Sequence, residues 1–139
     1  MLSLRQVGQE TVALLAAGHG AAASIFAAWS RGGTGGWTLS SLLSTGGATL
    51  LSASSGPGGT VMIDLGGRRA EIAAPGRAWQ RLPRLPPGTV ILAAGPASRT
   101  ADAFAVRRAT LTIWRASPAS QGWTKTQTIS VPIQYGSSG

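Results

Sequence analysis

The chain has 139 residues, of which 43% are apolar, so it is long enough and apolar enough to form one domain with a buried core. It contains no cysteine, which excludes disulfide bonds, thiolate chemistry and cysteine-based metal sites. The net charge of +8 comes from twelve basic residues against four acids. Because the composition is rich in Ala, Gly and Arg, we attribute part of this excess to compositional bias and not to a binding function.

An apolar stretch near the start of the chain invites comparison with a targeting signal. Its apolar core, 12–17, is short, and Glu10 and His19 flank it. A membrane span needs about 18 or more uninterrupted apolar residues, and the apolar core of a signal peptide does not usually have such polar flanks. We therefore expect neither a membrane span nor a signal peptide here, and we assign the stretch to β-structure.

The first of three blade-like units, 11–42, is predicted to be incomplete. Residues 11–17 are expected as its first strand, because the Leu-Ala-Ala-Gly sequence at 15–18 is repeated at 92–95. Residues 25–29 supply a further strand. This unit is shorter than the last one by about one strand and its turn. We therefore expect three strands in it, or a merger of its second and third strands.

The other two units, 48–85 and 89–133, each fit four antiparallel strands, and 134–139 form a tail. Runs rich in Val, Ile, Thr and Leu, separated by Gly- and Pro-containing turns, are typical of such strands. In the middle unit the strands are expected at 48–53, 60–65, 69–73 and 79–82. In the last unit they are expected at 89–94, 102–106, 109–115 and 122–133.

Trp37, Trp79 and Trp123 recur at the spacing of these units, roughly every 40–45 residues, which is the period of β-propeller blades. We therefore predict an all-β fold, a partial β-propeller of about three antiparallel blades. The alternative is a β-sandwich, which shows similar strands but does not require periodic tryptophans. Complete propellers have about four to eight blades. Three blades leave apolar faces open, so we expect self-association, for example into a six-bladed ring, or the missing blades of a longer chain.

The loops before these tryptophans resemble the repeats of Asp-box and WD-type propellers. An Asp box has the form Ser-x-Asp-x-Gly-x-Thr-Trp, and the segment 30–37 keeps Ser30 and Trp37 but lacks the aspartate. The segments 117–123 and 74–79 are shorter, and no tryptophan is followed by aspartate as in WD repeats. The resemblance implies a binding or scaffold function. The Arg-rich, acid-poor composition is similar to that of secreted or cell-envelope propellers of high-GC bacteria.

We accordingly expect a non-catalytic binding or scaffold module with no cofactor, no metal and a protein or glycan ligand. Glycan binding or glycan processing, as in lectin or sialidase propellers, is one alternative function. In that interpretation Trp37, Trp79 and Trp123 would stack on sugars, whereas a structural role would pack them between blades. The ligand is expected on the loop-rich face or in the central channel.

Catalytic groups for glycan processing are few in this sequence. A sialidase-type site needs an arginine cluster, an acid and a tyrosine activated by a glutamate. Arg68, Arg99 and Arg107 would supply the cluster, but the glutamates Glu10 and Glu71 lie in different units and Tyr135 lies in the tail. Hydrolysis by two carboxylates would instead use Asp64 and Asp102, which occupy similar second-strand positions. A solvated turn, or a hydrogen bond to a neighbouring backbone amide, is the structural alternative for both aspartates.

The arginines give the second alternative function, binding of an anionic polymer through the hairpin tips. The residues concerned are Arg68, Arg69, Arg107 and Arg108. Nucleic acid is not expected as the partner, because aromatic stacking positions are few and no RNA-binding signature is present. His19 is the lone histidine, and a metal site would need two or three further ligands.

Overall fold

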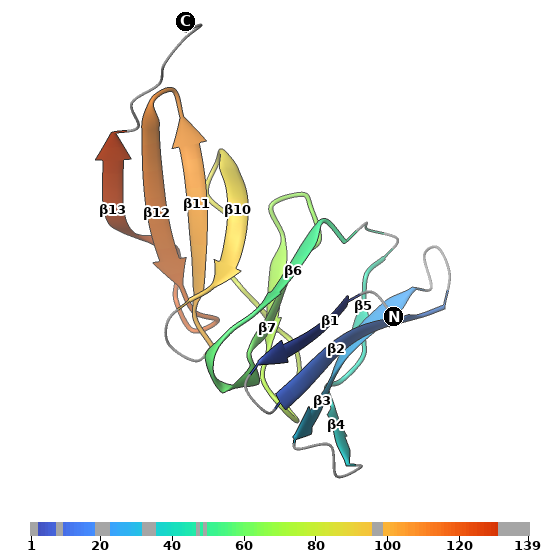
Figure 1. The fold of residues 1–139 in the computed structure, drawn as a ribbon. Helices are drawn as coiled ribbons and strands as arrows, with labels where there is room; N and C mark the ends of the chain where they lie inside the picture. Colours follow the sequence, from blue (N-terminus) through green and yellow to red (C-terminus); the bar gives the residue numbers. More distant parts are fainter. Residues whose placement is uncertain are drawn as a thin grey trace, which may run out of the picture.

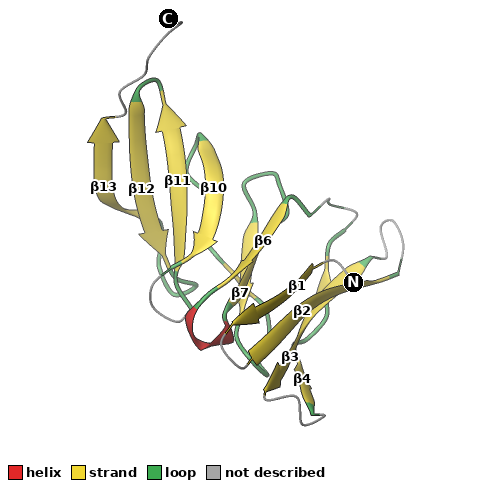
Figure 2. Cartoon of the chain, viewed as in Figure 1, coloured by secondary structure: helices red, strands yellow, loops and turns green. Residues whose placement is uncertain are grey.

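The computed structural model describes residues 3–7, 10–18, 23–31, 36–46, 48, 50–95 and 99–130. These residues form an all-β structure, in which the one helical segment is a short 3₁₀ turn, η2 (Pro57–Gly59) (Figure 2). The part of the chain that is described contains no helix with the length and apolar character that crossing a membrane requires.

Three antiparallel sheets follow one another along the chain, each built from strands that pair with their sequence neighbours (Figure 1). The first sheet contains β1 (Ser3–Val7), β2 (Glu10–Ala17), β3 (Ser24–Arg31) and β4 (Trp37–Leu39), with β5 (Leu43–Ser44) also paired to β3. The middle sheet contains β6 (Ser52–Ser55), β7 (Val61–Asp64), β8 (Ala70–Ala73) and β9 (Gln80–Arg81). The last sheet contains β10 (Thr89–Ala94), β11 (Ala101–Arg107), β12 (Thr110–Ala116) and β13 (Thr124–Ser130).

The strands of the middle and last sheets lie within a few residues of the predicted ranges, but the interpretation of the first sheet is wrong in its strand order. Residues 11–17 belong to β2, the second strand, because β1 precedes it and pairs with it from Ser3↔Leu14 to Val7↔Glu10. The first sheet therefore begins before the predicted unit 11–42 and has the same four-strand path as the others. The repeated Leu-Ala-Ala-Gly sequence does not mark equivalent strands. It lies at the end of a second strand at 15–18 and at the end of a first strand at 92–95.

The middle sheet is buried on both faces, and this sets the order of the layers. One face carries Val61 and Ile63, which belong to a hydrophobic cluster with Leu14 and Trp29 of the first sheet. The opposite face carries Met62, whose cluster includes residues of the last sheet, among them Leu92, Ala101 and Ala103. Two separate cores thus join three layers, with the middle sheet between the other two (Figure 1). A two-layer β-sandwich has a single core, so the alternative fold does not describe this chain.

Trp29 on β3 bridges the first two sheets. Its side chain is 3% exposed within the first hydrophobic cluster. Its indole Nε1–H donates a buried hydrogen bond of 2.6 Å to the carbonyl oxygen of Gly59, at the end of η2. The ring therefore fills the core between two sheets, and its one polar atom is satisfied by the backbone of the neighbouring sheet.

Candidate functional site

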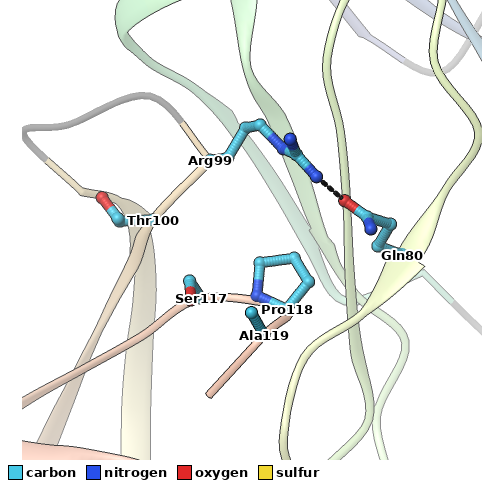
Figure 3. A pocket seen from close by; sticks show the side chains of 6 residues that line it. All are labelled: Gln80, Arg99, Thr100, Ser117, Pro118 and Ala119. Atoms are coloured by element: carbon cyan, nitrogen blue, oxygen red, sulfur yellow. Dashed lines mark hydrogen bonds between the residues drawn. The ribbon is translucent and has the colours of Figure 1, made fainter.

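A pocket of about 360 Å³ lies where the middle and last sheets meet (Figure 3). Gln80, at the start of β9, lines it from the middle sheet. The last sheet contributes two loops: Arg99 and Thr100 from the β10–β11 connection, and 117–119 from the β12–β13 connection. The pocket is thus built by segments about 20 residues apart in sequence, and it exists only because the two sheets pack together.

Among the described residues that line this pocket, only Arg99 has a charged side chain. Its backbone has a positive φ of 64°, a conformation that is uncommon for residues other than glycine. Its amide N–H donates a 3.2 Å hydrogen bond to the hydroxyl of the buried Thr60, which itself donates to the carbonyl of Pro57 at 2.9 Å. The guanidinium donates from Nη2 to Oε1 of Gln80 (Figure 3). Both ends of the Arg99 residue are therefore held by the middle sheet.

The other polar groups of the pocket are hydroxyls and an amide. Thr100 and Ser117 lie on the two loops, and the 117–120 turn is closed by hydrogen bonds from the Ser117 amide to the Ser120 hydroxyl at 3.0 Å and between the two hydroxyls at 3.1 Å. Pro118 stiffens that loop, since its ring fixes one backbone dihedral. A guanidinium with neutral donors and acceptors around it suits an anionic ligand that also carries hydroxyl groups.

Three acids have described side chains, and each is engaged outside the pocket. Glu71 is 3% exposed and accepts hydrogen bonds from Nε of Arg69 at 3.1 Å and of Arg81 at 3.0 Å. Asp102 accepts two hydrogen bonds from Arg115, at 2.7 and 3.0 Å. These hydrogen bonds, with the charge of Asp102, raise the pKa of Arg115 above its ordinary value.

Asp64, the third of these acids, accepts a 2.9 Å hydrogen bond from the backbone amide of Gly66, so it has the turn role that was the structural alternative to catalysis. Asp102 also has a structural partner, but that partner is the side chain of Arg115 and not a backbone amide. Neither aspartate lines the pocket. Within the described ranges, no group of three or more His, Cys, Asp or Glu side chains is placed to hold a metal ion.

The three periodic tryptophans stand at the same place in their sheets, at the entry to the fourth strand. Trp37 is the first residue of β4, Trp79 directly precedes β9, and Trp123 directly precedes β13. Trp79 packs against the first hydrophobic cluster and Trp123 against the second. These two rings have the inter-sheet packing that a periodic large aromatic predicts. Trp37, by contrast, is 51% exposed.

The predicted arginine cluster is divided by the fold. Successive strands of a meander reverse direction, so the β10–β11 loop with Arg99 lies at one end of the last sheet and the β11–β12 turn lies at the other. Arg107 and Arg108 are exposed at that turn. Arg68 lies at the corresponding β7–β8 turn and donates from Nε to the carbonyl of Leu85 at 2.8 Å. Arg68 and Arg107 therefore do not join Arg99 in one site, so a sialidase-type cluster does not form.

Arg69 differs from the other hairpin arginines because its charge is paired with Glu71 within the middle sheet. His19 and Tyr135 lie outside the described residues, as does the side chain of Glu10. Gln80, Thr100 and Ser117 were not expected in a site. Single polar residues in loops or at strand ends carry no sequence signal, and only the packing of two sheets brings these three together.

No family model, curated protein or solved structure matches this chain.

Proposed function

We propose that this chain is a non-catalytic binding module of the β-propeller type, with the pocket between its middle and last sheets as the ligand site. The propeller interpretation is supported by three successive four-strand meanders that pack face to face in chain order. It is also supported by Trp79 and Trp123, which occupy equivalent positions between successive sheets. A binding function is favoured because the described carboxylates all have structural partners.

The ligand we propose is a small acidic sugar, or the acidic end of a glycan. The observation that carries this proposal is the Arg99 guanidinium, held by Gln80 in a pocket with hydroxyl groups and no carboxylate among its described lining residues. Arginine pairs with a carboxylate through two parallel N–H donors, while Thr100, Ser117 and Gln80 can exchange hydrogen bonds with sugar hydroxyls. A pocket of about 360 Å³ is within the range of small-ligand sites.

The test compares glucuronate-terminated oligosaccharides with their uncharged glucose counterparts, titrated into the full chain by calorimetry. The charged sugar is expected to bind at least roughly tenfold more tightly, as is typical of a charge-assisted hydrogen bond. Arg99→Gly should abolish this preference without straining the backbone, because glycine adopts the positive φ of position 99 readily.

The matched control is Arg108→Gly. Arg108 also has a positive φ, of 55°, but lies at the other end of the last sheet. The Arg108→Gly variant should keep full affinity for the charged sugar, and neither variant should lower the midpoint temperature of thermal unfolding. Equal affinity of the two sugars for the parent chain, or an equal loss in both variants, would contradict the proposal.

A second candidate function, binding of an anionic polymer, is favoured because the β7–β8 and β11–β12 turns lie at the same edge of the molecule. The 85–88 segment connects them: the amide of Leu85 donates to the carbonyl of Arg68 at 3.0 Å, and the amide of Val106 donates to the carbonyl of Gly88 at 3.3 Å. Arg68, Arg107 and Arg108 therefore belong to one edge of the molecule. Their charges are not neutralised by a described carboxylate, unlike that of Arg69.

This candidate predicts that a sulfated polysaccharide binds with an affinity that falls steeply as salt rises, because binding releases counterions. The double variant Arg107→Ala/Arg108→Gly should bind more weakly and show a shallower salt dependence in fluorescence titrations. Arg77→Ala is the control, since Arg77 is exposed in the β8–β9 loop, away from these turns. Affinity that does not depend on salt would remove this candidate.

A further inference from the structure

The tryptophans at the fourth strands make a repeated contact with the preceding sheet. The indole Nε1 of Trp79 donates to the carbonyl of Ser41 at 3.0 Å, and that of Trp123 donates to the carbonyl of Pro83 at 3.0 Å. In each case the acceptor lies two residues beyond the end of the preceding sheet's fourth strand, which is Leu39 for β4 and Arg81 for β9. The same rule, an indole hydrogen bond to the second residue after the preceding sheet's fourth strand, thus describes both junctions between successive sheets.

Trp37 occupies the same position in the first sheet, but the described residues form no further sheet on its side. Strand register places it opposite Ser30 and places Leu39 opposite Ala28, on the face away from the middle sheet, because Trp29 and Ala27 are in the core. Trp37 is 51% exposed and Leu39 56% exposed. No described residue accepts a hydrogen bond from the Trp37 indole. By the rule above, this face of the first sheet is built to receive the end of another fourth strand.

The last sheet has the complementary open face. Strand pairing places Ile91 opposite Phe104, and Val106 and Ile129 opposite Leu111, all on the face away from the middle sheet. Ile91 is 57% exposed, Val106 45% and Ile129 37%. In the middle sheet, by contrast, both faces are buried against a neighbouring sheet. A contiguous exposed apolar face of this kind is typical of an interaction surface.

We propose that these two faces bind each other between two copies of the chain, arranged head to tail. The first sheet of each copy would pack against the last sheet of the other, so a two-fold axis covers both open faces and closes a ring of six sheets. A second copy is favoured over an unrelated partner because it continues the existing junctions.

This inference is independent of the ligand pocket, which lies between the middle and last sheets of one copy. It is tested by sedimentation velocity and native mass spectrometry on the full chain. The expected mass is twice the 14.1 kDa of one chain. Trp37→Glu, and separately Val106→Glu, should each weaken dimerisation by at least roughly a hundredfold, since a charge would then be buried at both junctions. Trp37→Phe keeps an aromatic ring but loses the N–H donor, and it should weaken dimerisation by roughly tenfold.

Mixing the two glutamate variants tests the head-to-tail arrangement directly. Each mixed pair retains one intact junction, formed by the first sheet of the Val106→Glu copy and the last sheet of the Trp37→Glu copy, so heterodimers should reappear. Leu51→Ser is the control, because Leu51 is 64% exposed but lies in the loop before β6. Circular dichroism of each variant checks that the sheets remain folded.

Two results would overturn the proposal. A parent chain that stays monomeric at high micromolar concentration would show that a second copy does not cover these faces, and it would point to further sheets of a longer chain. A dimer that is broken by Trp37→Glu but unaffected by Val106→Glu would show that two first sheets pair with each other instead.

Discussion

Replacing Trp29 with alanine is expected to lower the free energy of unfolding by about 3–5 kcal/mol, the usual cost of deleting a large buried aromatic side chain. The ring is 3% exposed, lies between the first and middle sheets, and donates a 2.6 Å hydrogen bond to the carbonyl of Gly59. Its removal would leave both a cavity and an unsatisfied buried acceptor. The change is measured by urea denaturation at a fixed protein concentration.

Two further variants separate the contributions of the ring. Trp29→Phe keeps most of the packing but loses the indole donor, so it should cost about 1–3 kcal/mol. Leu42→Ala, at a site that is 65% exposed, should change stability by no more than about 0.5 kcal/mol. If Trp29→Ala were no more destabilising than Leu42→Ala, the first and middle sheets would not share the core described above.

The sequence contains a direct signal for most of the strands. Alternation in 101–107 places Ala103 and Ala105 on the buried face and Phe104 on the other, as period-two patterning predicts. Trp79 and Trp123 mark the entry to the fourth strand of the middle and last sheets as predicted, because an indole that bridges two sheets must recur once per sheet. These features could be predicted because each leaves a regular pattern in the sequence, an alternation in one case and a repeat period in the other.

The order of strands in the first sheet could not be predicted in the same way. The run 15–18 matches 92–95 residue for residue, yet pairing with Ser3–Val7 makes it part of a second strand. Small residues suit the end of any strand that enters a tight turn, so their identity does not fix the position of that strand in the sheet.

The pocket also depends on packing between sheets. Gln80 belongs to the middle sheet and Arg99 to a loop of the last, and nothing in the local sequence of either residue indicates the other. The predicted cluster of Arg68, Arg99 and Arg107 rests on residue type alone, because the sequence shows their charge but not their positions in the fold. The reversal of strand direction puts Arg99 at the opposite end of the sheets from the other two.

Adding one methyl group at Gly56 is expected to disturb the junction of the middle and last sheets. A Cβ at this position would lie 2.6 Å from Cβ of Ala94, a separation that real atoms do not tolerate. The backbone of Gly56 is extended, with φ −153°, which alanine adopts readily, so the effect would come from the contact and not from the backbone. Gly56→Ala should therefore cost about 1–3 kcal/mol of unfolding free energy, the usual cost of overpacking.

The neighbouring methyl group offers a compensating change, because Ala94 lies on β10 and its amide donates to the hydroxyl of Ser54 on β6 at 3.2 Å. In Gly56→Ala/Ala94→Gly the methyl group moves from β10 to the residue that follows β6, so the double variant should be more stable than the sum of the single changes by at least about 1 kcal/mol. Gly122→Ala is the control, since a Cβ there would meet no atom within 4 Å. Strictly additive effects of the two single changes would show that β6 and β10 do not approach each other as closely as this, and the contact between the middle and last sheets would have to be reconsidered.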